Sequence, residues 1–506
     1  MKTRLTGLVA ALLLVAGLGF ANGKAEHVVL IVWDGMRPEF VNETDTPTLA
    51  KLARSGVTFA NHHAVYISST EVNGVALATG MYPNHDGVIA NREYRPALDP
   101  LRRIEIESLD TIARGDQISD GHYLRAPTLP EILRGAGRTV AVAGTKPVAL
   151  LFDRSNPNQV KITAAPKFDA PNTRLDAATT RSLIGSLWDA GVPTFSLLWL
   201  SDPDTTQHTT WPGSVEARQA MKSVDADLAL VLDELAAKGV RERTDVLVVS
   251  DHGFSTVLQT IDVAAALRKA GFPAAREYEQ PPRPGSVVVV GNGGSVSLYV
   301  IGHDRALVRK IVEYLQQQDF TGVIMTREPV TGTFTLEQVR LNSPDAPDIV
   351  VALRWTEEKN QAGVAGMIFS DGATYGKMTV GSGRGGHSSL SPFDIHNTLI
   401  AAGPDFRAGL VDPFPSSNTD LAPTILHVLA IASPAPMDGR VLVEALIGAP
   451  AKLAPVETRK LENSRVGGQF VWQQYLWFSE FGGETYLDGG NGSPQVIHRE
   501  EKAASP

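Results

Sequence analysis

The chain has 506 residues, 43% of them apolar, which is enough to bury a large hydrophobic core. Its formal net charge is −9, and no Lys/Arg stripe with interleaved aromatic residues is evident, which argues against a nucleic-acid-binding or anionic-membrane surface. Cysteine is absent, which excludes disulfide bonds and a lipid-modified cysteine.

The N-terminus has the pattern of a cleaved signal peptide. A basic start, Met1 to Arg4, precedes a short apolar stretch from Leu8 to Ala16 and small residues near Gly23. This stretch is shorter than the roughly 20 apolar residues that a spanning helix needs. We therefore assign residues 1–23 to a signal peptide and expect a periplasmic or secreted protein with no membrane anchor after cleavage.

The next region alternates strand-like and helical patterns. From Glu26 to about Ser255, apolar runs alternate with helical stretches such as Pro47 to Arg54 and Ser214 to Lys238. This alternation predicts βαβ units and an α/β fold, with a doubly wound, mostly parallel central sheet flanked by helices. We expect one catalytic domain over residues 24–450.

Two later regions depart from this pattern. Apolar runs and one helical stretch between about residues 260 and 380 predict a small α+β insertion. Within residues 451–506, an aromatic-rich stretch from Phe470 to Tyr486 is followed by glycine-rich turns. This stretch predicts a C-terminal aromatic hairpin packed on the body of the protein.

Six dispersed acidic and histidine residues carry the strongest functional signal. They are Asp34, Asp204, His208, Asp251, His252 and His387. Five of them close or follow apolar runs typical of buried strands, at residues 28–33, 195–200 and 246–249. In an open α/β sheet, side chains at the carboxyl ends of separate strands converge. Carboxylates and imidazoles together suit zinc or a similar divalent ion.

A family resemblance rests on five motifs in a fixed order. They are Asp34-Gly35, the segment Ser68 to Pro83, Pro203 to His208, Ser250 to Gly253, and Gly386-His387. With these motifs the chain resembles the alkaline phosphatase superfamily, in its nucleotide pyrophosphatase/phosphodiesterase-like branch, over roughly residues 26–446. A single motif would be weak support, but the shared order makes coincidence a poor explanation.

The resemblance implies a role for each matching residue. Thr70 matches the family's threonine nucleophile at a helix start, and Asn91 matches the asparagine that holds a phosphoryl oxygen. The implied ligands are Asp34, Thr70, Asp251 and His252 at a first metal site, and Asp204, His208 and His387 at a second. The implied cofactors are two divalent metal ions, for which zinc is the expected metal.

The chemistry of these residues supports the implied roles. A threonine hydroxyl is a poor nucleophile at neutral pH, so it needs a base or a metal ion to favour the alkoxide. A second ion at roughly 4 Å would stabilise the leaving oxygen and then activate a water. Asn91 and the backbone N–H of Thr70 would share the charge on the non-bridging oxygens. We therefore expect a small-molecule phosphoester substrate and a double displacement through a phosphothreonine.

Three positions bear on which ester is cleaved. Glu71 stands where typical nucleotide-cleaving members carry an aromatic residue, and its charge would repel an anionic substrate unless it is paired or turned away. Lys146 stands where certain monoester-cleaving relatives carry a lysine, but their arginine two residues later is replaced by Val148. The sequence thus favours a phosphodiesterase or nucleotide pyrophosphatase. A phosphomonoesterase using Lys146 as a substrate contact is the alternative, and an inactive phosphoester-binding protein is a remote one.

The remaining histidines that we considered receive no functional role from the sequence. They are His62, His63, His85, His122 and His396. Nothing in their spacing gives them a partner, so we interpret them as ordinary core or surface residues.

Overall fold

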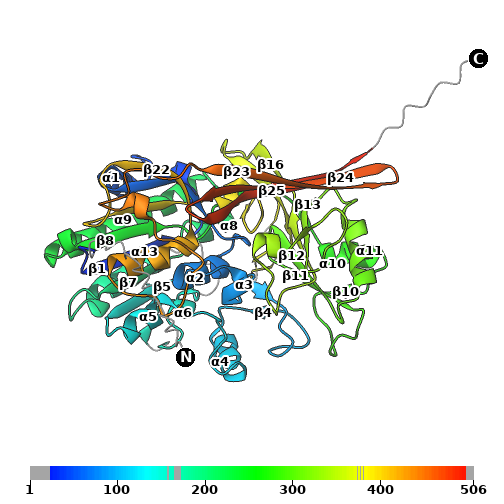
Figure 1. Cartoon of the computed structure of the whole chain (residues 1–506), viewed down its shortest axis with the longest axis horizontal. Helices are drawn as coiled ribbons and strands as arrows, with labels where there is room; N and C mark the ends of the chain where they lie inside the picture. The colour runs from blue at the N-terminus through cyan, green and yellow to red at the C-terminus, as the bar shows by residue number, and fades with distance from the viewer. Residues whose placement is uncertain are drawn as a thin grey trace, which may run out of the picture.

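A computed structural model describes residues 23–156, 159–163, 173–372, 374–375, 378–379 and 381–496 (Figure 1). The expected signal peptide, apart from Gly23, lies outside these residues. In the described part of the chain, no helix combines the length and apolar character needed to cross a membrane.

A large sheet forms the centre of the protein. In the described part of the chain it has eight strands in the order β22-β2-β21-β8-β1-β7-β5-β6. Their bounds are β1 His27–Trp33, β2 Val57–His63, β5 Val140–Gly144, β6 Lys161–Ile162, β7 Phe195–Leu200, β8 Thr244–Val249, β21 Leu399–Ala402 and β22 Leu410–Ser417. β1 lies between β7 and β8, parallel to both, and β5 and β6 continue the parallel arrangement, whereas β21 runs antiparallel to β8.

Helices cover both faces of this sheet, which explains why its central strands are continuous apolar runs. Alternate residues of β1 enter two different hydrophobic cores: Val28, Leu30 and Val32 face one, and Val29, Ile31 and Trp33 face the other. The first core includes α2 (Thr70–Thr79), α5 (Leu129–Gly135), α6 (Ala149–Phe152) and α13 (Leu421–Val428), and the second includes α1 (Pro47–Ser55) and α9 (Val215–Ala237). The predicted α/β class, with a mostly parallel central sheet flanked by helices, is confirmed.

A second sheet with its own core lies beside the first, on the right in Figure 1. Its strand order is β10-β11-β12-β15-β13-β14. The bounds are β10 Ala274–Ala275, β11 Val287–Gly291, β12 Ser295–Val300, β13 Thr321–Thr326, β14 Phe334–Thr335 and β15 Ile349–Leu353. The helices α10 (Val263–Lys269) and α11 (Arg305–Leu315) supply part of its core. These elements lie within residues 260–380, where we expect an α+β insertion.

A smaller sheet carries the segment that precedes His387 back toward the central sheet. It pairs β16 (Trp355–Lys359), β17 (Ala365–Asp371), β9 (Ser255–Ile261) and β20 (Gly385–Gly386) in that order. β9 begins three residues after His252, and β20 ends directly before His387. Pairing of β20 with β9 therefore brings His387 close to the end of β8.

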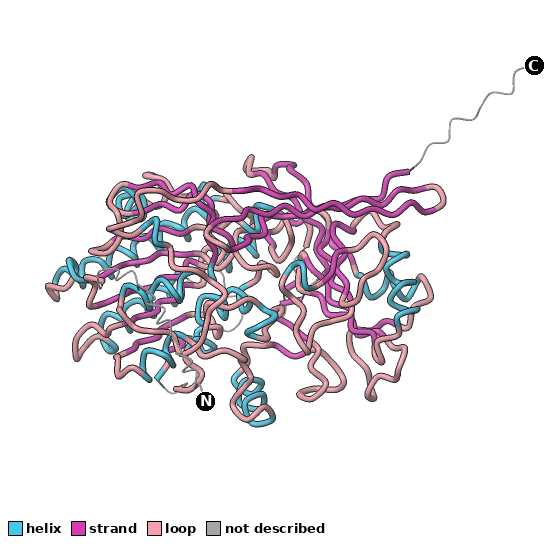
Figure 2. The backbone as a smooth tube through the Cα atoms, viewed as in Figure 1, coloured by secondary structure: helices cyan, strands magenta, loops and turns pink. Residues whose placement is uncertain are grey.

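The C-terminal stretch forms three antiparallel strands where the sequence suggested a hairpin. They are β23 (Glu457–Gly467), β24 (Phe470–Phe481) and β25 (Glu484–Val496), with β24 in the middle. Figure 2 shows them as a long ribbon across one side of the molecule. Trp472 and Leu476 are buried in the cores of the second sheet, so aromatic and aliphatic packing fixes this ribbon to the body.

Candidate active site

The six predicted metal ligands converge at the carboxyl ends of the central strands. Asp34 directly follows β1, Asp251 and His252 follow β8, and α8 (Asp204–Thr209) begins shortly after β7. All six side chains belong to residues that are at most 3% exposed. Because β1 lies between β7 and β8, the parallel register aligns the three strand ends at one edge.

One cluster contains Asp204, His208 and His387. Asp204 and His208 are one helical turn apart on α8, which places Nε2 of His208 at 3.2 Å from Oδ1 of Asp204. His387 directly follows β20, and its Nε2 lies 3.7 Å from Oδ1 of Asp204. These three residues are the predicted second metal site.

A second cluster adjoins the first. Nε2 of His252 lies 3.3 Å from Oδ2 of Asp251 and 3.7 Å from Oδ1 of Asp34. Asp204 also belongs to this group, since its carboxylate comes within 4.8 Å of donor atoms of Asp34 and His252. The rings of His252 and His387 stack with centroids 3.8 Å apart. Asp204 thus lies at the junction of the two clusters.

Backbone carbonyl groups orient all three histidines. Each Nδ1 is hydrogen-bonded to a carbonyl oxygen at 2.8–3.1 Å. The pairs are His252 with Gly253, His208 with Gly385, and His387 with Ser68. A carbonyl can only accept, so each Nδ1 carries a proton, and each Nε2 faces the carboxylates, where it can bind a cation held between them.

The donor set fits a bound cation. Among the described residues, three buried carboxylate oxygens at this site have no hydrogen-bond partner: Oδ1 of Asp34, Oδ1 of Asp204 and Oδ2 of Asp251. Burial, and then the neighbouring Asp251 charge, raise the pKa of Asp34 well above its ordinary value. A divalent ion would offset this crowding of buried negative charge, and mixed carboxylate and imidazole donors suit zinc.

Thr70 lies at the edge of the cluster that contains His252. It is the first residue of α2, and its Oγ1 is 3.3 Å from Nε2 of His252. Every residue of α2 is buried, so the position of the hydroxyl is set by core packing as well as by the helix start. This places a hydroxyl and the N-terminus of a helix next to the candidate metal centre.

The side chain of Asn91 contacts the first turn of α2, at the residue after Thr70. Its Oδ1 accepts a hydrogen bond of 3.1 Å from the backbone N–H of Glu71. The Glu71 side chain is buried. That burial, followed by the charge of Glu107, raises the pKa of Glu71 well above its ordinary value. A raised pKa favours the neutral form of Glu71, which weakens the repulsion of an anionic substrate that the sequence suggested.

Lys146 occupies the middle of the site. Its Nζ lies 2.6 Å from Oδ2 of Asp204 and 2.8 Å from Oδ2 of Asp34. Burial lowers the pKa of Lys146, but the charges of Asp204, Asp34 and Asp251 outweigh it and leave the pKa well above its ordinary value. Val148, in contrast, is a buried core residue beside Gly74 of α2.

Some residues that contact the site or form a cluster were not predicted from the sequence. The Nε1 of Trp199 donates a 2.9 Å hydrogen bond to Oδ2 of Asp34, and the only local signal for this is its place near the end of an apolar run. Among the histidines without an assigned role, His62 and His85 have hydrogen-bond partners. His63 and His396 gather with Asp488 in a third cluster, which the spacing did not indicate.

The fold is that of ectonucleotide pyrophosphatase/phosphodiesterases. The solved structure of murine ectonucleotide pyrophosphatase/phosphodiesterase 5 superposes with a TM-score of 0.60 at 16% identity, covering 83% of this chain and 100% of that one. An inactive threonine-to-alanine variant of that protein, in complex with AMP, gives 0.59 at 16% identity over 83% of this chain and 100% of that one. At such low identity the likeness establishes the fold alone.

Residues 28–356 match the type I phosphodiesterase/nucleotide pyrophosphatase family, and the chain belongs to that family. The resemblance drawn from the motifs is thereby confirmed. A venom phosphodiesterase from Crotalus durissus collilineatus is 25% identical over 246 residues, covering 47% of this chain and 27% of the relative. Member 3 of the ectonucleotide pyrophosphatase/phosphodiesterase family from Mus musculus is 25% identical over 236 residues, covering 45% and 24%. The matches thus span about a quarter of these relatives.

Proposed function

We propose that this protein is an exported, two-metal phosphoester hydrolase of the phosphodiesterase/nucleotide pyrophosphatase type that forms a phosphothreonine on Thr70. The observation that carries this proposal is the 3.3 Å approach of Thr70 Oγ1 to His252 Nε2, beside two adjoining clusters of buried carboxylates and imidazoles. Family membership supports the same reaction class.

The proposed first site is formed by Asp34, Thr70, Asp251 and His252, and the proposed second site by Asp204, His208 and His387. Divalent ions there, for which zinc fits the donors, would supply Lewis-acid charge that favours the threonine alkoxide and the leaving oxygen. The orphaned carboxylate oxygens and the uniform Nε2 orientation of the histidines support this assignment.

The chain's own groups position the phosphoryl group. Oγ1 of Thr70 attacks phosphorus from the first turn of α2, where the backbone N–H of Thr70 and the helix dipole favour the non-bridging oxygens. The Glu71 N–H holds Oδ1 of Asn91, which leaves the Asn91 amide N–H groups for a phosphoryl oxygen. Attack releases the first alcohol, and water then cleaves the phosphothreonine and restores the Thr70 hydroxyl.

A phosphomonoesterase is the second candidate, because the Lys146 ammonium lies between Asp34 and Asp204. If ions neutralise these carboxylates, Lys146 becomes available for the extra negative charge of a monoester. Family membership favours the diester. The substrate is proposed to be a small-molecule phosphoester, and the AMP complex of the murine relative's inactive variant supports a nucleotide.

Export is proposed from the basic and apolar pattern of residues 1–23. The names of relatives, a venom enzyme and an ectonucleotide enzyme, agree with action outside the cytoplasm.

The proposal is tested by turnover of a bis-aryl phosphate with zinc-loaded wild type, Thr70→Ala and the exposed-threonine control Thr44→Ala. Hydrolysis by the wild type and the control, with loss in Thr70→Ala, is the expected result. A folded, metal-loaded wild type that cleaves neither mono- nor diesters would instead indicate the inactive binding protein.

A further inference from the structure

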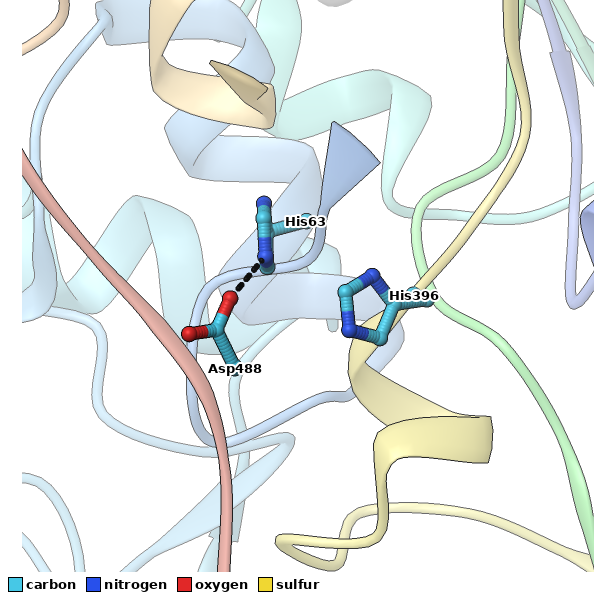
Figure 3. Close-up of side chains that lie close together, drawn as sticks. All are labelled: His63, His396 and Asp488. Atoms are coloured by element: carbon cyan, nitrogen blue, oxygen red, sulfur yellow. Dashed lines mark hydrogen bonds and ion pairs between the residues drawn. The ribbon is translucent and has the colours of Figure 1, made fainter. Parts of the chain in front are cut away.

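A third cluster of metal-ligand side chains lies outside the proposed active site. It contains His63, at the end of β2, His396, directly after α12 (Pro392–Ile395), and Asp488, in β25. Each residue offers one donor atom, and these atoms all lie within 4.8 Å of one another. Figure 3 shows both imidazoles and the carboxylate directed toward one another. The cluster therefore joins the central sheet to the C-terminal ribbon.

The orientation of His63 points to a positive charge inside this cluster. Its Nδ1 is hydrogen-bonded at 2.8 Å to the backbone carbonyl of Ser416, and its Nε2 lies 2.7 Å from Oδ1 of Asp488. The carbonyl requires the proton on Nδ1, so the Nε2 of a neutral ring faces the carboxylate with a lone pair. A proton or a metal ion must lie between these two atoms. A backbone carbonyl on the far nitrogen is the usual support for a metal-bound histidine.

The other two side chains are also prepared for a metal ion. His396 supplies one ring nitrogen to the group, within 4.8 Å of the donor atoms of the other two residues. Ser479 Oγ donates to both carboxylate oxygens of Asp488, at 3.1 and 2.9 Å. The His63 and His396 rings approach with centroids 4.6 Å apart.

We propose that His63, His396 and Asp488 bind a divalent ion of the zinc type, distinct from the active-site ions. Two imidazoles and one carboxylate are a common three-residue zinc set, with a fourth position for water. Binding at ~2.0–2.1 Å from each donor requires Nε2 and Oδ1 to separate to roughly 3.3 Å. Asp488 can make this small movement, since β25 is the edge strand of its sheet and the side chain is 19% exposed.

The ion would cross-link three segments that are far apart in the sequence. His63 ends the strand that leads, seven residues later, to Thr70, and His396 lies nine residues after His387. Asp488 adds the C-terminal ribbon to both. Coordination would therefore hold the ribbon against the segments that carry the proposed nucleophile and one proposed ligand.

The test is the number of zinc ions retained per chain after dialysis, measured by elemental analysis on folded protein. We expect His396→Gln and Asp488→Asn each to retain about one ion fewer than wild type. The matched control is His85→Gln, which removes an exposed histidine paired with Asp438 at 2.8 Å but with no third ligand in any described metal-type group. This control should retain the wild-type number.

The comparison is repeated in the Asp251→Asn variant, with and without Asp488→Asn. The same difference of one ion is expected there, so the result does not depend on whether the active-site ligands are assigned correctly. Zinc should also raise the Tm of wild type more than that of Asp488→Asn. Equal ion numbers in wild type and both variants would overturn the proposal and identify the 2.7 Å contact as a proton-bridged ion pair. An equal effect of zinc on both Tm values would overturn it too.

Discussion

Nζ of Lys146 lies 2.6 Å from Oδ2 of Asp204, at the junction of the two acidic and histidine clusters. This position would make Lys146 a positively charged neighbour of a phosphoryl group bound at the proposed metal sites. Whether the ammonium contacts the substrate decides between the two proposed ester classes, because a monoester carries one more negative charge than a diester.

Lys146→Ala should lower kcat/KM for an aryl phosphate monoester by about 10- to 100-fold more than for a bis-aryl phosphate. A hydrogen bond between charged groups is worth about 1.5–3 kcal/mol, and each 1.36 kcal/mol changes the rate tenfold. The comparison requires both substrates with each variant, and the exposed lysine variant Lys51→Ala is the control. Equal losses on both esters would discard the monoester role of Lys146.

Thr70→Ala should lower turnover by at least about 10³-fold while metal content stays near the wild-type value. The variant removes the proposed nucleophile, and losses of a nucleophile are typically this large or larger. The carboxylates and imidazoles that hold the ions remain in place. Loss of metal in parallel with activity would show that Thr70 acts mainly through the metal site.

Asp251→Asn and His387→Gln should each reduce both bound metal and activity, the latter by at least about 100-fold. Each change removes a donor from a different cluster, so the two variants are expected to lose different ions. Asp233→Asn, on the exposed face of α9, is the matched control. If activity survives in both ligand variants, the site assignment is wrong.

Asp245 should make the protein less stable as the pH rises. It is a buried residue of β8, and burial, followed by the charge of Asp405, raises its pKa from 3.8 to about 8. Between these two values the folded state retains a proton that the unfolded state releases. The free energy of unfolding therefore falls as the pH increases through this window.

Asp245→Asn removes the charge but keeps an oxygen to accept the backbone N–H of Asp405. Urea unfolding at pH values of about 5 and 9 should show a smaller loss of stability in this variant, by at least about 1 kcal/mol. Asp233→Asn should follow the wild type. An unchanged pH dependence in Asp245→Asn would contradict a raised pKa for Asp245.

The strand-end residues were predictable because a parallel sheet aligns its carboxyl ends. Asp34 directly follows a buried apolar run, Asp251 and His252 lie just after another, and the register of β1 with β8 brings the three together. The position of Asp204 between both clusters was not predictable, since it depends on how α8 packs against the two neighbouring strand ends.

The C-terminal ribbon shows where local patterns fail. Strand β23 consists largely of exposed polar and charged residues, so no apolar alternation marks it as a strand. The cluster of His63, His396 and Asp488 depends on where this ribbon docks. Such long-range pairing leaves no signal in the spacing of the three residues.

The most direct test of the central claim is the stereochemistry of hydrolysis at phosphorus. A chiral phosphorothioate diester is hydrolysed in isotopically labelled water, and the configuration of the product is determined. Attack by Thr70 followed by attack of water gives two inversions, so the account predicts net retention. Net inversion would mean that water attacks the substrate directly, and it would contradict the phosphothreonine intermediate.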